Sequence, residues 1–217
     1  MKKLLLALGF LALWAVPTVA QVPCVGVGGV NTVPQVGLAC PQEALVNSYA
    51  ASGIGIAPAA SATDITCIQG ATNTVIRLQR LRVSGTAGTQ IIVPVVLMKR
   101  ASLDTGGTPA TSTALPVAYP LDSANSAAKA TLNAWTANPT IVDSSPGILA
   151  VENLILSKTD GTNGVALTES LFEFDAGITI EKPTLRKATE ALCVNLNSTS
   201  PSSGLVNVTW VWTEASQ

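Results

Sequence analysis

The sequence contains no histidine and has few charged or aromatic residues. Among its 217 residues, 12 are Lys or Arg, 13 are Asp or Glu, and only 4% are aromatic. The lack of histidine excludes Ser-His-Asp and Cys-His catalytic sites and all zinc sites with an imidazole ligand. The lack of a basic excess argues against binding to nucleic-acid phosphates. We therefore expect a protein that is not an enzyme and needs no cofactor.

What the chain does contain is apolar and small. Hydrophobic residues make up 47% of it, and this content with so few charges is typical of a folded chain rather than a disordered one. At the N-terminus, Lys2 and Lys3 precede an apolar run over residues 4–16. Small residues then lead to a plausible cleavage site between Ala20 and Gln21, which is the pattern of a secretory signal peptide.

The length of this apolar run indicates whether it could cross a membrane. A helix needs roughly 20 apolar residues to cross a bilayer, so residues 4–16 are too few for a comfortable span. We predict that residues 1–20 are a signal peptide and that the mature protein has no stable membrane insertion. Export to the periplasm, the extracellular space or a particle surface follows, and an uncleaved N-terminal anchor is the alternative.

The four cysteines suit an oxidising compartment. They are Cys24, Cys40, Cys67 and Cys193, and three pairings are possible. We predict a local disulfide Cys24–Cys40 and a long-range disulfide Cys67–Cys193. A metal site built from all four is the alternative, but no C-x2-C pair is present, so we expect no metal.

Residues 21–62 are rich in Gly, Pro, Ala and Val, and Glu43 is their only charged residue. We predict an irregular N-terminal arm with at most one helical turn near residues 42–49. An arm of this composition either packs on a neighbouring subunit or is mobile, and the sequence leaves both possibilities open.

From residue 63 to residue 217 the hydrophobic pattern has the period of two that is typical of strands. Val206, Val208, Trp210 and Trp212 share one face of a strand, which indicates that both tryptophans lie in the core. Further strands are expected at residues 66–69, 74–83, 90–98, 114–119, 131–136, 148–156, 171–174, 178–180, 184–186 and 191–197. So many short strands separated by turn residues predict an all-β fold, a two-sheet antiparallel sandwich resembling a jelly roll.

Two of these strands carry local irregularities. The alternation in residues 74–83 changes phase at Gln79 and Arg80, which predicts a β-bulge there. Pro94 lies within residues 90–98 and cannot donate to a ladder, so that strand is expected to be an edge strand or to carry a bulge.

Candidate functional residues are few. Trp135 is a candidate ligand contact, because its segment is less regular than that of the other tryptophans. Arg80 and Arg82 share a face after the bulge, either as surface cations paired with nearby acids or as part of an interface between subunits. Glu173 and Asp175 lie two residues apart on a strand, and such pairs are more often a solvated surface than the acid and base of a glycosidase.

Residues from about 78 to 213 resemble a group of uncharacterised β-rich proteins from phage and phage-derived bacterial loci. The resemblance rests on LRVSGTAGTQIIVPVVLMKR (81–100), DTGGT (104–108), PLDSANSAAKATLNAWTANPT (120–140) and CVNLN…LVNVTWVWTE (193–214). It implies a jelly-roll-like structural protein of a virion or cell surface. It implies no site residue.

Two functions are compatible with these observations. The first is an exported structural protein that forms homo-oligomers through its N-terminal arm and its sheet edges. The second is a secreted β-sandwich module that binds a glycan or another surface ligand.

Overall fold

A computed structural model describes residues 46–141, 143, 147–158, 169–174, 181–199, 201 and 203–217. The chain divides into two units, Met1–Gln42 and Glu43–Gln217, and all described residues belong to the second. The predicted signal peptide, Cys24, Cys40, Asp175 and the strand expected at residues 178–180 lie outside the described residues.

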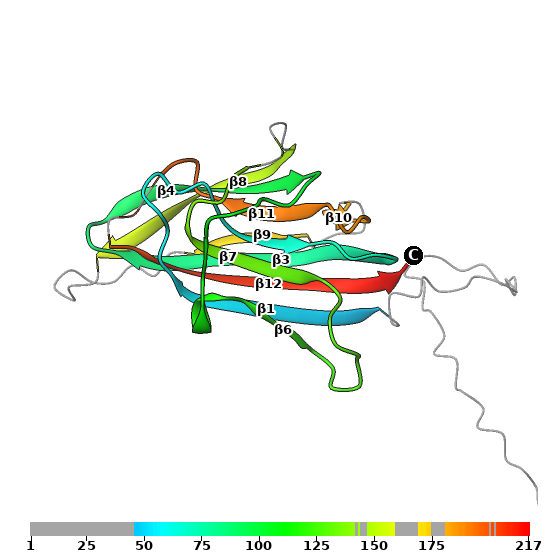
Figure 1. Ribbon diagram of the computed structural model, residues 1–217. Coiled ribbons are helices and arrows are strands. Elements are labelled where there is room, and N and C mark those ends of the chain that lie inside the picture. The colour runs from blue at the N-terminus through cyan, green and yellow to red at the C-terminus, as the bar shows by residue number, and fades with distance from the viewer. Residues whose placement is uncertain are drawn as a thin grey trace, which may run out of the picture. The chain divides into compact units, whose positions relative to one another are not determined.

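The described residues are almost entirely strands and loops (Figure 1). The strands are β1 (Asn47–Ile56), β2 (Asp64–Gln69), β3 (Thr74–Ala87), β4 (Ile91–Arg100), β5 (Thr108–Pro109), β6 (Val117–Pro120), β7 (Thr131–Ala137), β8 (Gly147–Lys158), β9 (Glu169–Glu173), β10 (Thr184–Leu185), β11 (Ala191–Asn195) and β12 (Leu205–Ser216). One short 3-10 helix, η2 (Ser112–Ala114), precedes β6. No helix in the described part of the chain is long and apolar enough to cross a membrane.

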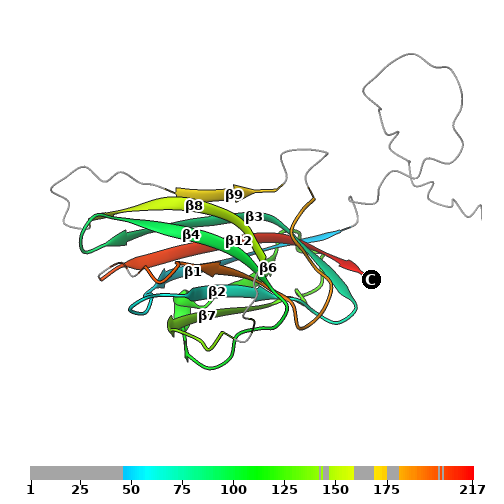
Figure 2. The same cartoon turned by 90° about the horizontal axis from the view of Figure 1, so that it is seen from above.

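The strands form one curled sheet in the order β5-β7-β2-β11-β4-β8-β3-β12-β1-β6, and β9 and β10 add to β3. Figure 2 shows β2 and β7 together on one side of the molecule and β8 and β9 on the other. The pairs are antiparallel except β3–β8, which is parallel through Thr86↔Ser157 and Ala87↔Lys158. The predicted all-β fold is confirmed. The sheet is mixed and continuous, whereas the sequence predicted two antiparallel sheets, and the jelly-roll arrangement stays a prediction.

The hydrophobic core lies inside the curl. A single cluster joins side chains from β1, β3 and β12 to side chains from β2, β4 and β11. Trp210 and Trp212 are fully buried in it, as their alternation in the sequence predicted, and the Trp212 ring stacks on Tyr49 with centroids 5.7 Å apart. Burial of large aromatic rings of this kind is a major source of stability in a sheet protein.

Both predicted irregularities have counterparts in the structure. β12 pairs Val211 with Arg80 and Trp212 with Leu78, so Gln79 is the extra residue of a bulge. Around Pro94, β4 pairs with β8 only, because its pairing with β11 covers just Val96 to Arg100. The proline therefore lies where β4 has one neighbour, although a bulge in β4 falls between Leu97 and Met98.

Residues 47–56 differ from the sequence prediction. They form β1, which pairs with β12 on one side and with β6 on the other, instead of belonging to an irregular arm or a helical turn. The segment NSYAASGIGI has weak alternation because small residues fill it. Pairing with the long strand β12 decides its structure, and local propensity does not.

Candidate functional sites

The disulfide Cys67–Cys193 joins β2 to β11 at positions that face each other in the ladder. It closes a separation of 126 residues, and both cysteines are fully buried. The sequence prediction of this pair is confirmed. The predicted pair Cys24–Cys40 lies outside the described residues.

Trp135 packs beside this disulfide. Its side chain is 6% exposed and forms a second small apolar cluster with Cys67, Cys193 and Ala191, against which Leu103 packs. A ring that stacks on a ligand must be open to solvent on one face, so the prediction of Trp135 as a ligand contact is wrong. Its segment lacks a clear alternation because neighbouring residues of β7 are both buried, Ala134 in the main core and Trp135 in this second cluster.

The same outer face holds a buried ion pair. Arg100 donates from Nε and Nη2 to the two carboxylate oxygens of Asp64, at 2.5 and 2.9 Å, and both side chains are about 1% exposed. Asn195 also donates to Asp64, and the backbone oxygen of Asp143 accepts from Arg100 at 3.1 Å. Burial lowers the pKa of Arg100, but the hydrogen bond and charge of Asp64, with the charges of Asp104 and Asp143, outweigh it and raise the pKa above its usual value.

Asp64, Asp104, Cys67 and Cys193 bring potential metal ligands within 4.8 Å of one another. Their chemistry does not suit an ion, because the two sulfurs are bonded to each other and offer no thiolate. Arg100 also lies 2.5 Å from Asp64 and 3.8 Å from Asp104, and its positive charge opposes a second cation. The cluster is a structural junction between the sheet and the loop after β4.

Arg80 and Arg82 lie on the exposed face of β3, in the part of the strand that pairs with β9. Arg80 is 3.1 Å from Glu173, and Arg82 contacts Glu169 at 2.7 Å with a second hydrogen bond at 2.9 Å. The hydrogen bond and the charge of Glu169 raise the pKa of Arg82. These pairs within one chain are what the surface-cation interpretation predicts. They also give Glu173 a cationic partner.

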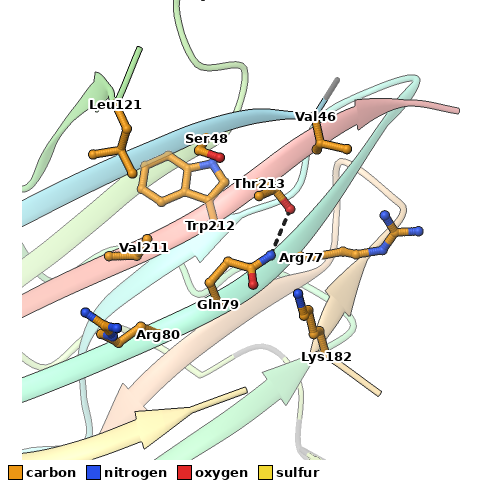
Figure 3. Close-up of a pocket in the computed structure, with 10 residues that line it drawn as sticks. All are labelled: Val46, Ser48, Arg77, Gln79, Arg80, Leu121, Lys182, Val211, Trp212 and Thr213. Atoms are coloured by element: carbon orange, nitrogen blue, oxygen red, sulfur yellow. Dashed lines mark hydrogen bonds between the residues drawn. The ribbon is translucent and has the colours of Figure 1, made fainter. Parts of the chain in front are cut away.

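The β3 bulge opens a surface pocket of about 330 Å³, which we call the bulge pocket (Figure 3). Because Gln79 is the extra residue, Gln79 and its neighbour Arg80 both line the pocket together with Arg77. Lys182, from the segment before β10, supplies a third cation. The rest of the wall comes from β1, β12 and the residue that follows β6, and it comprises Val46, Ser48, Leu121, Val211, Trp212 and Thr213.

Hydrogen-bond donors predominate in the bulge pocket. Gln79 donates its side-chain amide to the Thr213 hydroxyl at 3.1 Å, which leaves the Gln79 carbonyl and the Thr213 proton for other partners. No Asp or Glu is among the described residues that line the pocket. Among the described residues, Arg77 has no ion pair or side-chain hydrogen bond, in contrast to Arg80. The sequence showed the arginines and the bulge, but nothing in it indicated that Lys182 lies beside them.

A second concave surface lies at the β6 end of the sheet. This β6 groove has a volume of about 560 Å³ and is lined by β1, η2 and β6 without any charged side chain. Ile54, Val117 and Tyr119 project from its walls with 59%, 53% and 67% of their surface exposed. β6 is the last strand in the order of the sheet, so its outer edge has no neighbouring strand among the described residues.

The described part of the chain is an all-β fold with a buried disulfide, a donor-rich pocket and an apolar groove at a sheet edge. Comparisons with protein-family models, with curated proteins and with solved structures found no match to this chain.

Proposed function

We propose that this is an exported structural protein that forms homo-oligomers, with the β6 groove as a contact surface between copies. The observation that supports it is the combination of an open sheet edge with exposed apolar side chains in an uncharged groove. Soluble monomers seldom leave such surfaces open, and an unpaired edge strand offers a row of backbone groups to another chain.

The occupant that we propose for the groove is the N-terminal arm of a neighbouring copy. Residues 21–45 are rich in apolar residues and carry a single charge, on Glu43, so their chemistry complements a groove without charge. They lead into the chain at Val46, directly before β1, which forms one wall of the groove. A segment of 25 residues spans at most roughly 85 Å when fully extended, which is enough to reach another copy. An added strand would satisfy the open edge of β6.

The experiment is the native mass of the oxidised chain from Gln21 to Gln217, measured by light scattering after size exclusion. We expect a trimer or a larger closed assembly. Removal of residues 21–45 should release folded monomers, and the deletion must stop there because β1 begins at Asn47.

Two single substitutions make the test specific to the groove. Tyr119→Lys places a charge in it and should release monomers, whereas Ile92→Lys places a charge on a residue of β4 that is similarly exposed, at 61%, and should not. A wild-type monomer, or assembly that survives both the deletion and Tyr119→Lys, would overturn the proposal.

The second function that we propose is a secreted module that binds a glycan or another surface ligand. The bulge pocket favours it, because its volume of about 330 Å³ lies within the range of small-molecule sites. A glycan panel probed with the oxidised protein tests it. Saturable binding to any member supports the module, and no binding across the panel argues against it.

A further inference from the structure

We propose that the bulge pocket binds the oxyanion group of a small molecule, a phosphate, sulfate or carboxylate. This inference names the ligand chemistry of the second proposed function and rests on it, but it is independent of self-association. It starts from the charge of the pocket walls. Arg77, Arg80 and Lys182 line the pocket, and none of the other described residues that line it is acidic, in a chain whose formal net charge is −1.

The three cations are not equivalent. Glu173 lies 3.1 Å from Arg80 and neutralises much of its charge. It belongs to β9, which pairs with the edge of β3 that faces away from β12. Arg77 has no acidic partner among the described residues and is only partly exposed. Figure 3 shows Gln79 between Arg80 on one side and Arg77 and Lys182 on the other. Arg77 is therefore the residue that we expect to bind the anion, since a guanidinium offers two parallel donors to an oxyanion.

The neutral groups of the pocket favour the same ligand. The Thr213 hydroxyl accepts from Gln79, so its own proton is directed to another acceptor. The Ser48 hydroxyl also faces the pocket, and its backbone oxygen accepts from the Leu121 amide, which holds the pocket wall in place. A ligand rich in acceptor oxygens satisfies these donors, while Val46, Leu121 and Val211 provide an apolar wall for its carbon skeleton.

The bulge itself is the structural reason for the site. In a regular strand Gln79 and Arg80 would point to opposite faces of the sheet. The extra residue at Gln79 lets the side chains of both line one pocket. Bulges redirect side chains in this way beside many functional sites.

The test is an NMR titration of the isotope-labelled, oxidised chain from Gln21 to Gln217. The probes are inorganic phosphate, inorganic sulfate, glucuronate and glucose, each compared with sodium chloride at equal ionic strength. We expect saturable shifts of the Gln79 side-chain amide and of Thr213 with at least one of the three oxyanions. Stronger binding of phosphate or sulfate identifies a tetrahedral anion as the ligand group, and stronger binding of glucuronate identifies a carboxylate on a sugar.

Variants separate a specific site from general attraction to positive charge. Arg77→Gln should weaken binding about tenfold or more, the value of one charge-assisted hydrogen bond. Arg186→Gln is the matched control, since Arg186 is exposed just after β10 and does not line the pocket, and it should leave binding unchanged. A far-ultraviolet circular dichroism spectrum checks that both variants are folded.

Three outcomes would overturn the inference. If Arg77→Gln and Arg186→Gln weaken anion binding equally, the anions are attracted to positive charge in general and do not bind at a specific site. If glucose binds saturably in the pocket and Arg77→Gln does not alter that binding, the protein is still a binding module, but its ligand group is not an oxyanion. If no probe shifts the NMR signals of Gln79 and Thr213, the pocket is not a binding site. The glycan panel then tests separately whether the protein binds a ligand elsewhere.

Discussion

The guanidinium of Arg100 is held by the carboxylate of Asp64 at a position where neither side chain reaches solvent. A buried charge that loses its partner has no water to replace it. We therefore expect Asp64→Ala to reduce the free energy of unfolding by about 3–5 kcal/mol, because it removes both hydrogen bonds of the ion pair and leaves the buried Arg100 charge to the more distant carboxylate of Asp104 and to Asp143. Urea unfolding followed by tryptophan fluorescence measures the loss.

The exposed pair Arg82–Glu169 is the control for this measurement. Its side chains are 49% and 35% exposed, so water replaces the partner when Arg82→Gln removes it. We expect that variant to lose less than about 1 kcal/mol. Similar losses in the two variants would contradict the view that burial makes the Asp64–Arg100 pair important.

The Cys67–Cys193 disulfide should contribute strongly to stability, since it closes a separation of 126 residues. The chain-entropy model gives about 4–5 kcal/mol for a loop of this size. We expect the double variant Cys67→Ala/Cys193→Ala to unfold at a clearly lower urea concentration than the wild type, both measured without reductant. An unchanged midpoint would mean that the pairing of β2 with β11 alone holds these strands.

Glu190 makes a contribution to the free energy of unfolding that depends on pH. Burial disfavours its charged form, but hydrogen bonds from the Arg186 and Lys187 amides and the charge of Lys99 outweigh this, so its pKa lies below the usual 4.5. A carboxylate with a lowered pKa stabilises the fold above its unfolded-state pKa, and the effect disappears as the pH falls through the folded-state pKa.

The test of this contribution compares the wild type with Glu190→Gln. We expect the variant to be less stable near neutral pH and the difference to shrink as the pH falls below 4.5, the ordinary pKa of the carboxyl. Urea unfolding of both proteins at several pH values between about 7 and 3 measures this difference in stability. A difference that stays constant over this range would show that the Glu190 charge does not contribute.

Gly85 lies where β3 and β12 approach each other closely. A Cβ atom there would be 2.3 Å from the backbone oxygen of Leu205, and a backbone atom in a ladder cannot move aside cheaply. We expect Gly85→Ala to lower the free energy of unfolding by about 1–3 kcal/mol, the usual cost of overpacking. Gly147→Ala is the matched control in β8, because its nearest atom is 3.9 Å away, and its unfolding curve should match the wild type.

Sequence reasoning predicted features that depend on strong local patterns. The alternation of Val206, Val208, Trp210 and Trp212 revealed a half-buried strand, and the change of phase at Gln79 revealed a bulge. The long-range disulfide was one of only three pairings that four cysteines allow. In each case the residues themselves carry the periodicity or the chemistry that determines the structure.

Other features could not be predicted because they depend on contacts across the fold. Asp64 and Arg100 are 36 residues apart, and no local pattern shows that both are buried on one face of the sheet. β1 is built from small residues and is ordered by β12 and β6. Trp135 was mistaken for a surface residue because the outer face of the sheet, normally open to solvent, is covered here by loops and a second apolar cluster.

The order of strands has a consequence for how the protein folds. Among the described strands, no two that follow each other along the chain are paired in the sheet; β12, for example, joins Thr213 to Ser48 and to Arg77. The described strands therefore include no hairpin that could form early and serve as a template for the rest. Every ladder requires closure of a long loop, and topologies of this kind fold slowly. The chain should spend longer than a hairpin-rich protein of its size in states with unpaired strands, where association with other chains competes with folding.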